Sequence, residues 1–168
     1  MNSTSTVTKR KDVLSWDEYF MSLALLSAKR SKDPNTQVGA CIVDPSHKVH
    51  GIGYNGFPVG CDDDCLPWTR TAASPLNTKY MYVCHAELNA IMNSQSLSSI
   101  RGCTLYVTLF PCNECSKLII QAGISHVVYL VNKHPTSDSV RASERMFELA
   151  GVVVKQYGVA GKSIVLTV

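Results

Sequence analysis

The sequence predicts a single α/β domain built on a mixed sheet. Short apolar runs typical of strands alternate along the chain with segments of helical spacing, which indicates layers joined by crossover connections. The first two runs are separated by a short turn and predict an antiparallel hairpin, so the sheet is not wholly parallel. The 168 residues contain no repeat or low-complexity linker. We expect residues 13–168 to form this domain and residues 1–12 to be a disordered tail.

The first part of the chain predicts a helix, the hairpin and a long loop. Ser15 is a suitable helix cap because acidic residues follow it in the first turn, and Asp33-Pro34 is expected to end the helix. Strands are expected at 38–43 and 49–54. The loop from residue 55 to about 82 is rich in Gly, Asp and Pro. Loops this long inside compact domains are usually functional, so we expect function here.

The rest of the chain alternates helices with strands. The expected elements are a helix at 87–92, a strand at 104–108, a helix at 112–121, a strand at 127–131, a helix at 139–150, a strand at 152–155 and a terminal strand at 163–168. Gly123 and Gly151 follow two of these helices, as expected of helix C-termini. Two strand-to-helix junctions fall near residues 85 and 112, the kind of place where α/β sheets carry their sites.

Charge and composition exclude several classes of protein. The net charge is +3 and the longest basic run is residues 9–11, which argues against a dedicated nucleic-acid surface; a small anionic substrate needs only one or two cations. The chain has no apolar run long enough for a membrane span and no apolar secretory segment at its start. Seven cysteines cannot all pair internally. We therefore predict a reducing compartment, the cytoplasm, with a nuclear pool left open.

The most informative pattern is His85-Ala86-Glu87 and, after 23 intervening residues, Pro111-Cys112 and Cys115. It offers three zinc ligands and a carboxylate that need not be a ligand. Structural zinc usually has four protein ligands, whereas catalytic zinc has three and an open position. The order H-x-E, then P-C-x-x-C, is the signature of zinc nucleobase deaminases. We therefore predict Zn²⁺ and hydrolytic deamination of a cytosine-type base.

The spacing suits this chemistry. Cys112 and Cys115 are three residues apart and share a helix face, while His85 and Glu87 can converge at the start of a helix. The positive end of a helix stabilises thiolates. A zinc site lowers the pKa of its water. Glu87 would accept a proton from that water and return protons to the ring nitrogen and to the departing ammonia.

Other interpretations of these motifs stay open. A C-x-x-C pair alone also fits half of a structural zinc site or a redox dithiol. A deaminase acting on tRNA or single-stranded DNA uses the same zinc chemistry, but it must also bind the nucleotides that flank a flipped base. A free cytidine deaminase would ignore a 5′-phosphate. A zinc-stabilised binding module without turnover would not depend on Glu87, and Glu114 is interpreted as a solvated helix residue.

Four segments, 31–40, 53–58, 84–90 and 110–115, resemble the deoxycytidylate (dCMP) deaminases of the cytidine deaminase superfamily, a likeness that extends over about residues 14–168. The resemblance implies a three-layer fold with a five-stranded mixed sheet flanked by helices. It also implies conversion of dCMP to dUMP, supply of dTMP synthesis, a homohexamer, activation by dCTP, inhibition by dTTP, and Mg²⁺ with the regulatory triphosphate. The residues it assigns to zinc and to proton transfer are His85, Cys112, Cys115 and Glu87.

The resemblance also implies substrate contacts. Asn55 would contact the sugar and the Ala86 backbone would meet the base, while Phe110 fits either stacking on the base or a place in the core. For the phosphate, the expected residues in order of preference are Lys32, in the loop beside Asn35, and then Arg30.

The regulatory nucleotide is expected to bind the loop between residues 55 and 70. Gly56 and Gly60 could let backbone amides approach phosphates, with Arg70 at the end of this region. The acidic run 62–64 suits Mg²⁺ or a solvated turn.

Overall fold

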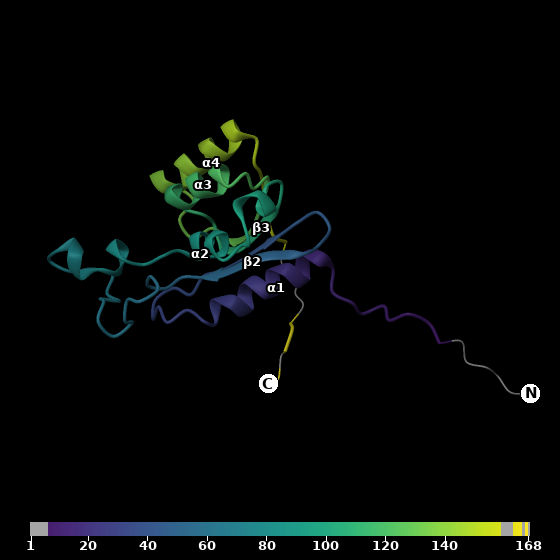
Figure 1. The fold of residues 1–168 in the computed structure, drawn as a ribbon, viewed down its shortest axis with the longest axis horizontal. Coiled ribbons are helices and arrows are strands. Elements are labelled where there is room, and N and C mark those ends of the chain that lie inside the picture. The colour runs from purple at the N-terminus through teal and green to yellow at the C-terminus, as the bar shows by residue number, and fades with distance from the viewer. Residues whose placement is uncertain (1–6, 159–162, 166, 168) are drawn as a thin grey trace, which may run out of the picture.

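A five-stranded mixed sheet forms the centre of the fold (Figure 1) in the computed structural model, which describes residues 7–158, 163–165 and 167. In chain order the strands are β1 (Gly39–Val43), β2 (Val49–Tyr54), β3 (Thr104–Leu109), β4 (His126–Val131) and β5 (Val153–Gln156). Their order across the sheet is β2-β1-β3-β4-β5. β1 is antiparallel to both β2 and β3, and β4 and β5 continue in parallel from β3. The predicted hairpin and mixed sheet are confirmed.

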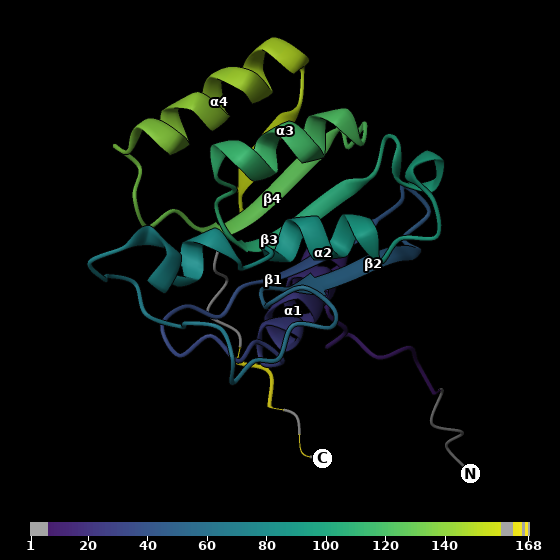
Figure 2. The same ribbon diagram turned by 60° about the vertical axis from the view of Figure 1, so that its left-hand side comes forward.

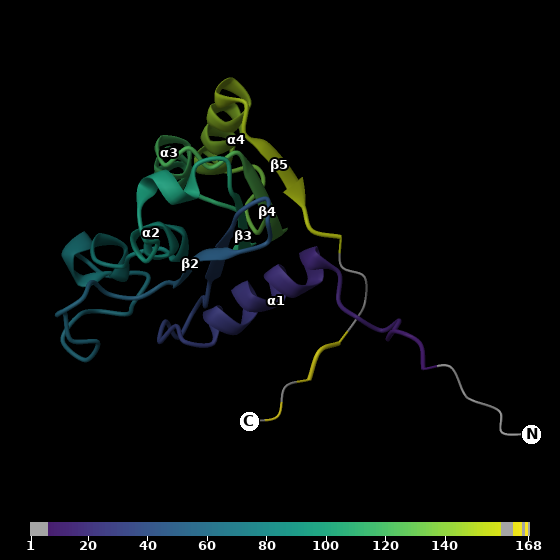
Figure 3. The same ribbon diagram turned by 45° about the vertical axis from the view of Figure 1, so that its right-hand side comes forward.

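Helices cover both faces of this sheet and complete three layers. They are α1 (Trp16–Ala28), α2 (Ala86–Met92), α3 (Asn113–Gln121) and α4 (Asp138–Ala150). Figure 2 shows α2, α3 and α4 in a row on one face, and Figure 3 shows α1 alone on the other. The predicted three-layer α/β fold is therefore confirmed. Within the described ranges, every helix is too short or too polar to traverse a bilayer.

The two faces of β1 supply two separate cores. Ala40 and Ile42 point into the larger core beneath α2, α3 and α4, while Cys41 and Val43 pack toward α1 with Phe20. Every residue of β1 is buried, as expected for a strand between two others and beneath helices on both faces. The period-two alternation of strand side chains thus joins both helical layers to one central strand.

The helix starts follow the predicted sequence signals. Ser15 caps α1 in a capping box, in which its side chain accepts from the Glu18 N–H and the Glu18 carboxylate accepts from the Ser15 N–H at 2.6 Å. The helix ends at Ala28, earlier than the predicted stop at Asp33-Pro34. The last turn tightens there into bonds three residues apart, and Ser31 then donates to the Asn55 carbonyl at 2.8 Å.

The predicted terminal strand at 163–168 is wrong for its described residues. Residues 163–165 and 167 form no strand, and residues 166 and 168 lie outside the described residues. Val165 is 82% exposed, and this end of the chain lies on the α1 side of the molecule, away from β5 (Figure 1). Apolar residues favour a strand only where the backbone of a sheet edge is available for pairing.

The structure describes only part of the N-terminal tail. Residues 7–12 are exposed and form neither helix nor strand, while residues 1–6 lie outside the described residues. The predicted disorder of residues 1–12 therefore stays a prediction.

The backbone of α2 lies directly on β2. A Cβ atom at Gly53 would come within 2.2 Å of the Ala86 carbonyl oxygen and 2.3 Å of the Ala90 nitrogen, and one at Gly51 within 2.1 Å of the Ala90 oxygen. Asn89 reinforces this contact, because its side-chain amide donates to the Tyr54 carbonyl at 2.7 Å. Glycines in β2 therefore set how deeply the start of α2 lies in the fold.

We expect Gly53→Ala to separate α2 from β2 and to lower the free energy of unfolding by about 3 kcal/mol, the upper range for overpacking. Urea denaturation would measure the loss. Gly56→Ala is the matched control, because a Cβ there has no atom within 4 Å. Equal stability of the two variants would contradict the direct contact.

Candidate active site

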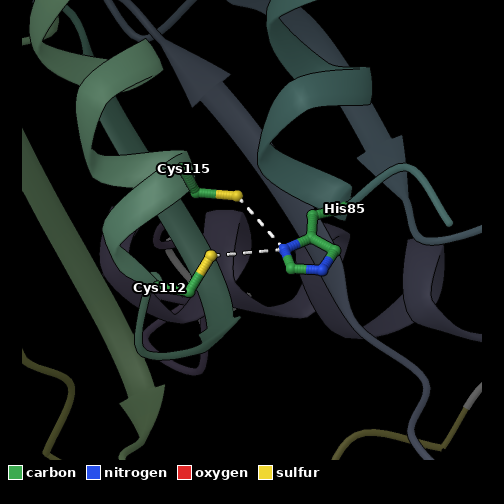
Figure 4. A group of neighbouring side chains, drawn as sticks. All are labelled: His85, Cys112 and Cys115. Atoms are coloured by element: carbon green, nitrogen blue, oxygen red, sulfur yellow. Dashed lines mark hydrogen bonds between the residues drawn. The ribbon is translucent and has the colours of Figure 1, made fainter. Parts of the chain in front are cut away.

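Two helix starts bring three metal-ligand side chains together. The start of α3 follows β3 as predicted, whereas the start of α2 follows a single β-bridge at Cys84 and not a strand. His85 is the N-cap residue of α2, and Cys112 is the N-cap residue of α3. In Figure 4 the His85 Nδ1 atom points at both sulfur atoms. It lies 3.5 Å from the Cys112 Sγ and 3.3 Å from the Cys115 Sγ. The structure thus places the three predicted ligands in one group.

This group fits a zinc ion. Zinc bonds of about 2.3 Å to sulfur and 2.0–2.1 Å to nitrogen, at a tetrahedral angle, separate the two ligand atoms by about 3.5 Å. The two observed nitrogen–sulfur distances agree with that separation. Among the described residues it is the one group of three or more metal-ligand side chains close enough for a shared ion. Three protein ligands leave a fourth position for water, as in catalytic sites.

The electrostatics of the group favour a thiolate at Cys112. The hydrogen bond from Cys115 is the main cause that lowers the pKa of Cys112 to about 4, and His85 adds to the effect. The same bonding raises the pKa of Cys115, while the bond to Cys112 raises the pKa of His85. A thiolate is the form that binds metal, so Cys112 is already in that form, whereas Cys115 has to release its proton when a cation binds.

Glu87 lies beside this group but is held differently. It is in the first turn of α2, two residues after His85, and is 4% exposed. Burial is the main cause that raises the pKa of Glu87 above its ordinary value. A carboxyl group with a raised pKa holds a proton more readily than an ordinary one, which suits a group that accepts and returns protons. Its position and the direction of this shift therefore suit general acid–base chemistry.

The group opens into a cavity of about 270 Å³. Its lining includes Asn55, Ala86, Glu87, Phe110 and Arg70, all singled out from the sequence. The cavity is large enough for a small ligand but lies at the lower end of ligand-site sizes. The structure thus places these five residues at the same cavity as His85 and Cys112.

A buried polar network forms the wall opposite the metal group. The Asp33 carboxylate pairs with the Lys79 ammonium, and their side chains are 1% and 6% exposed. Asp33 also accepts from the backbone N–H groups of Asn35 at 2.8 Å and Thr36 at 3.2 Å. Asn55 donates to the same carboxylate at 3.3 Å. Burial pushes the pKa of Asp33 upward, but these hydrogen bonds outweigh it and hold that pKa below its ordinary value.

Not every residue expected at the substrate lines the cavity. Lys32 is paired with Asp63, its side chain is 64% exposed, and it lies outside the cavity lining. The Asn35 side chain donates to the Trp68 carbonyl at 3.3 Å. Gly56 and Gly60 also lie outside this lining, so the predicted functions of these four residues stay predictions.

Sequence reasoning missed part of the lining, in particular Asp33, Lys79, Tyr80 and His134. The signal available for Lys79 was its place in the long loop just before the His85 motif. A cation at that point is not distinguishable from a surface lysine until its buried partner is known.

Comparison with known proteins agrees with this geometry. Residues 14–131 match the family described as the cytidine and deoxycytidylate deaminase zinc-binding region. The chain therefore belongs to this family of hydrolytic deaminases, as its predicted resemblance indicated.

The particular relatives are deoxycytidylate deaminases. The human protein of that name is 60% identical over 149 residues, which cover 89% of this chain and 83% of that protein. A probable deoxycytidylate deaminase of Drosophila melanogaster is 54% identical over 163 residues, covering 94% and 80%. Among solved structures, the dCMP deaminase of cyanophage S-TIM5 in complex with dCMP and dUMP superposes with a TM-score of 0.64 at 30% identity, covering 83% and 95%.

We expect Asp33→Asn to cost about 3–5 kcal/mol of unfolding free energy at neutral pH, because it leaves the Lys79 charge buried without its partner. The pKa of Asp33 is lowered in the folded state. Its contribution is therefore fully present above its unfolded value of about 4 and is lost as the pH falls below it. Urea denaturation between pH 3 and 7 should show a steeper acid loss in the wild type than in the variant.

Asp12→Asn is the control for that measurement. Asp12 is also ion-paired, with Arg10, but both side chains are largely exposed. Surface pairs contribute little, so this variant should follow the wild type at every pH. Parallel curves for Asp33→Asn and the wild type would contradict the stabilising effect of the buried pair.

Proposed function

We propose that this protein hydrolyses dCMP to dUMP and ammonia with one zinc ion. The observation that carries the proposal is the grouping of His85, Cys112 and Cys115 beside the buried carboxyl of Glu87 at one cavity. The names of the human relative and the nucleotides in the phage complex support dCMP as the substrate.

The residues around the cavity divide the chemistry. A bound zinc ion supplies Lewis acidity that lowers the pKa of water toward neutrality. Glu87 takes a proton from the attacking water and delivers protons to the ring nitrogen and to the departing amine. Ala86, fully buried beside it, offers its backbone to the base edge. Asn55 is oriented by its bonds to Asp33 and to the Val38 N–H, which prepares it for a sugar hydroxyl.

Arg70 is our proposed contact for the 5′-phosphate. Apart from the candidate metal ligand His85, three basic side chains line the cavity, Arg70, Lys79 and His134, and Lys79 is already paired with Asp33. Arg70 bonds to the neutral Tyr80 hydroxyl at 3.0 Å, so its charge is not neutralised by that partner. A guanidinium binds a phosphate through two parallel hydrogen bonds. In this proposal Arg70, which the sequence analysis assigned to the regulatory nucleotide, contacts the substrate phosphate instead.

The regulation that we propose rests on the family resemblance. It comprises activation by dCTP with Mg²⁺, inhibition by dTTP, a homohexamer, and a place in dTMP synthesis. The loop offers Gly60 with a φ of +88° and no atom near its Cβ position, so the backbone at this point is uncrowded, as a close approach to a phosphate requires. Asp62 accepts from the Asp64 N–H at 2.8 Å and so forms a turn, which favours a structural function for this acidic run.

Glu87→Gln should lower kcat by about 10³-fold, as expected when a general acid–base group is lost. The zinc content should stay at one ion per chain, because Glu87 is not one of the three ligands. Ammonia release and metal analysis test both points. Glu114→Gln is the control, since Glu114 is exposed and paired with Lys117 at 2.6 Å. A kcat for Glu87→Gln close to that of the wild type would contradict proton transfer by Glu87.

Arg70→Ala should reduce kcat/KM for dCMP by about 10–100-fold, the loss of charge-assisted hydrogen bonds of about 1.5–3 kcal/mol. Turnover of deoxycytidine, which has no phosphate, should change little. Lys32→Ala in the same assay tests the sequence-based alternative. Equal losses on both substrates for Arg70→Ala would argue against a phosphate contact.

The wild type should be assayed on dCMP, deoxycytidine and a cytosine-containing oligonucleotide. We expect turnover of dCMP and not of the oligonucleotide, and at low dCMP we expect dCTP to raise the rate and dTTP to lower it. Turnover of the oligonucleotide alone would show that dCMP is not the substrate. A curve insensitive to both triphosphates would remove the regulation and leave the chemistry standing.

A further inference from the structure

Helix α4 contacts the turn that carries the cysteine ligands. Figure 2 shows α4 alongside α3, and two serines of α4 reach the backbone at the start of α3. Ser143, fully buried, donates to the Pro111 carbonyl at 3.0 Å and to its own helix at Ser139. Ser139 accepts from the Asn113 N–H at 3.2 Å and donates to the Asn113 side-chain oxygen at 2.8 Å. Pro111 and Asn113 flank Cys112, so the residue on each side of this ligand is held from α4.

The start of α3 needs this support because its own cap residue is a cysteine. The first N–H groups of a helix have no partner within the helix and are normally satisfied by the side chain of a Ser, Thr, Asp or Asn cap. Cys112 occupies the cap position and its side chain makes no capping hydrogen bond. Its sulfur points toward His85 instead. The hydroxyl of Ser139 supplies an acceptor for one of these first N–H groups, that of Asn113.

The two serines act on different parts of the turn. Ser143 fixes the carbonyl that enters the turn, and Ser139 fixes both the N–H and the side chain of the residue that leaves it. The backbone of Cys112 between these points therefore has little freedom to rotate. Its sulfur is thereby kept at the observed 3.5 Å from the His85 Nδ1.

We propose that Ser139 and Ser143 are positioning residues for the metal site, which hold the Cys112 turn in the geometry that binds zinc. This inference rests on the zinc site of the proposed function. It adds α4, which contributes no metal ligand among the described residues, to the parts of the fold on which metal retention depends.

The test is the rate at which the folded, zinc-loaded protein loses zinc to an excess of a coloured chelator. Ser143→Ala and Ser139→Ala should each release zinc about tenfold faster, the lower end of the effects seen when groups that orient metal ligands are removed. Ser139→Thr keeps the hydroxyl and should restore the wild-type rate. The charge-transfer absorption of the cobalt-substituted protein should shift in the alanine variants and not in Ser139→Thr.

Ser137→Ala is the matched control for helix stability. Ser137 caps α4 by accepting from the Val140 N–H at 3.3 Å and has no hydrogen bond to the cysteine turn. It should lower the thermal stability of the protein and leave zinc release unchanged. Faster release in Ser137→Ala than in the other two alanine variants would overturn the proposal, because α4 stability alone would then explain the effect.

Two further outcomes separate this inference from the proposed function. Wild-type zinc binding with unchanged release and an unchanged cobalt spectrum in both alanine variants would overturn the positioning by α4 and leave the zinc site intact. A wild type that binds neither zinc nor cobalt would overturn the metal site itself, and the positioning with it.

Discussion

The site depends on the direct backbone contact between α2 and β2. At Gly53 there is no room for a Cβ atom, because the Ala86 carbonyl and the Ala90 nitrogen already occupy that space. This contact brings the first turn of α2 as close to the sheet as a helix can lie. His85 and Glu87 lie at the start of that turn, so the candidate metal ligand and the proposed proton-transfer group take their depth in the fold from this contact between two backbones. A side chain inserted between them would displace the chemistry as well as the packing.

At both helices of the site, a candidate metal ligand occupies the N-cap position in place of an ordinary capping residue. His85 and Cys112 stand at the N-cap positions of α2 and α3, and neither side chain caps its helix. A helix start with an unsatisfied N–H is costly, but its partial positive charge stabilises a thiolate. For α3, the hydroxyl of Ser139 accepts from the first of these N–H groups, that of Asn113. The fold thus keeps the electrostatic benefit of a helix start while a neighbouring helix satisfies one of its free N–H groups.

Part of the cavity lining is a polar network. Asp33 accepts hydrogen bonds from the backbone, from Asn55 and from Lys79, and all three side chains are almost fully buried. Low exposure strengthens each of these bonds and would make any unpaired member costly. The network holds Asn55 in the cavity lining and neutralises the charge of Lys79. In our proposal a phosphate therefore binds another cation of the lining, Arg70.

The sequence by itself determined the order and type of most elements, the three side chains that group as a candidate metal site, the neighbouring Glu87, and the family. These follow from periodicity, capping and short-range spacing, which are local properties of a chain. Only the tertiary structure decided which cations face the cavity. Lys32 lies beside a motif in sequence but pairs outward with Asp63, whereas Lys79 turns inward to Asp33, 46 residues away. The end of the chain behaves similarly, since its apolar residues predicted a strand that its described part does not form. Such outcomes depend on which partner surface is within reach, and this is fixed by packing between distant segments.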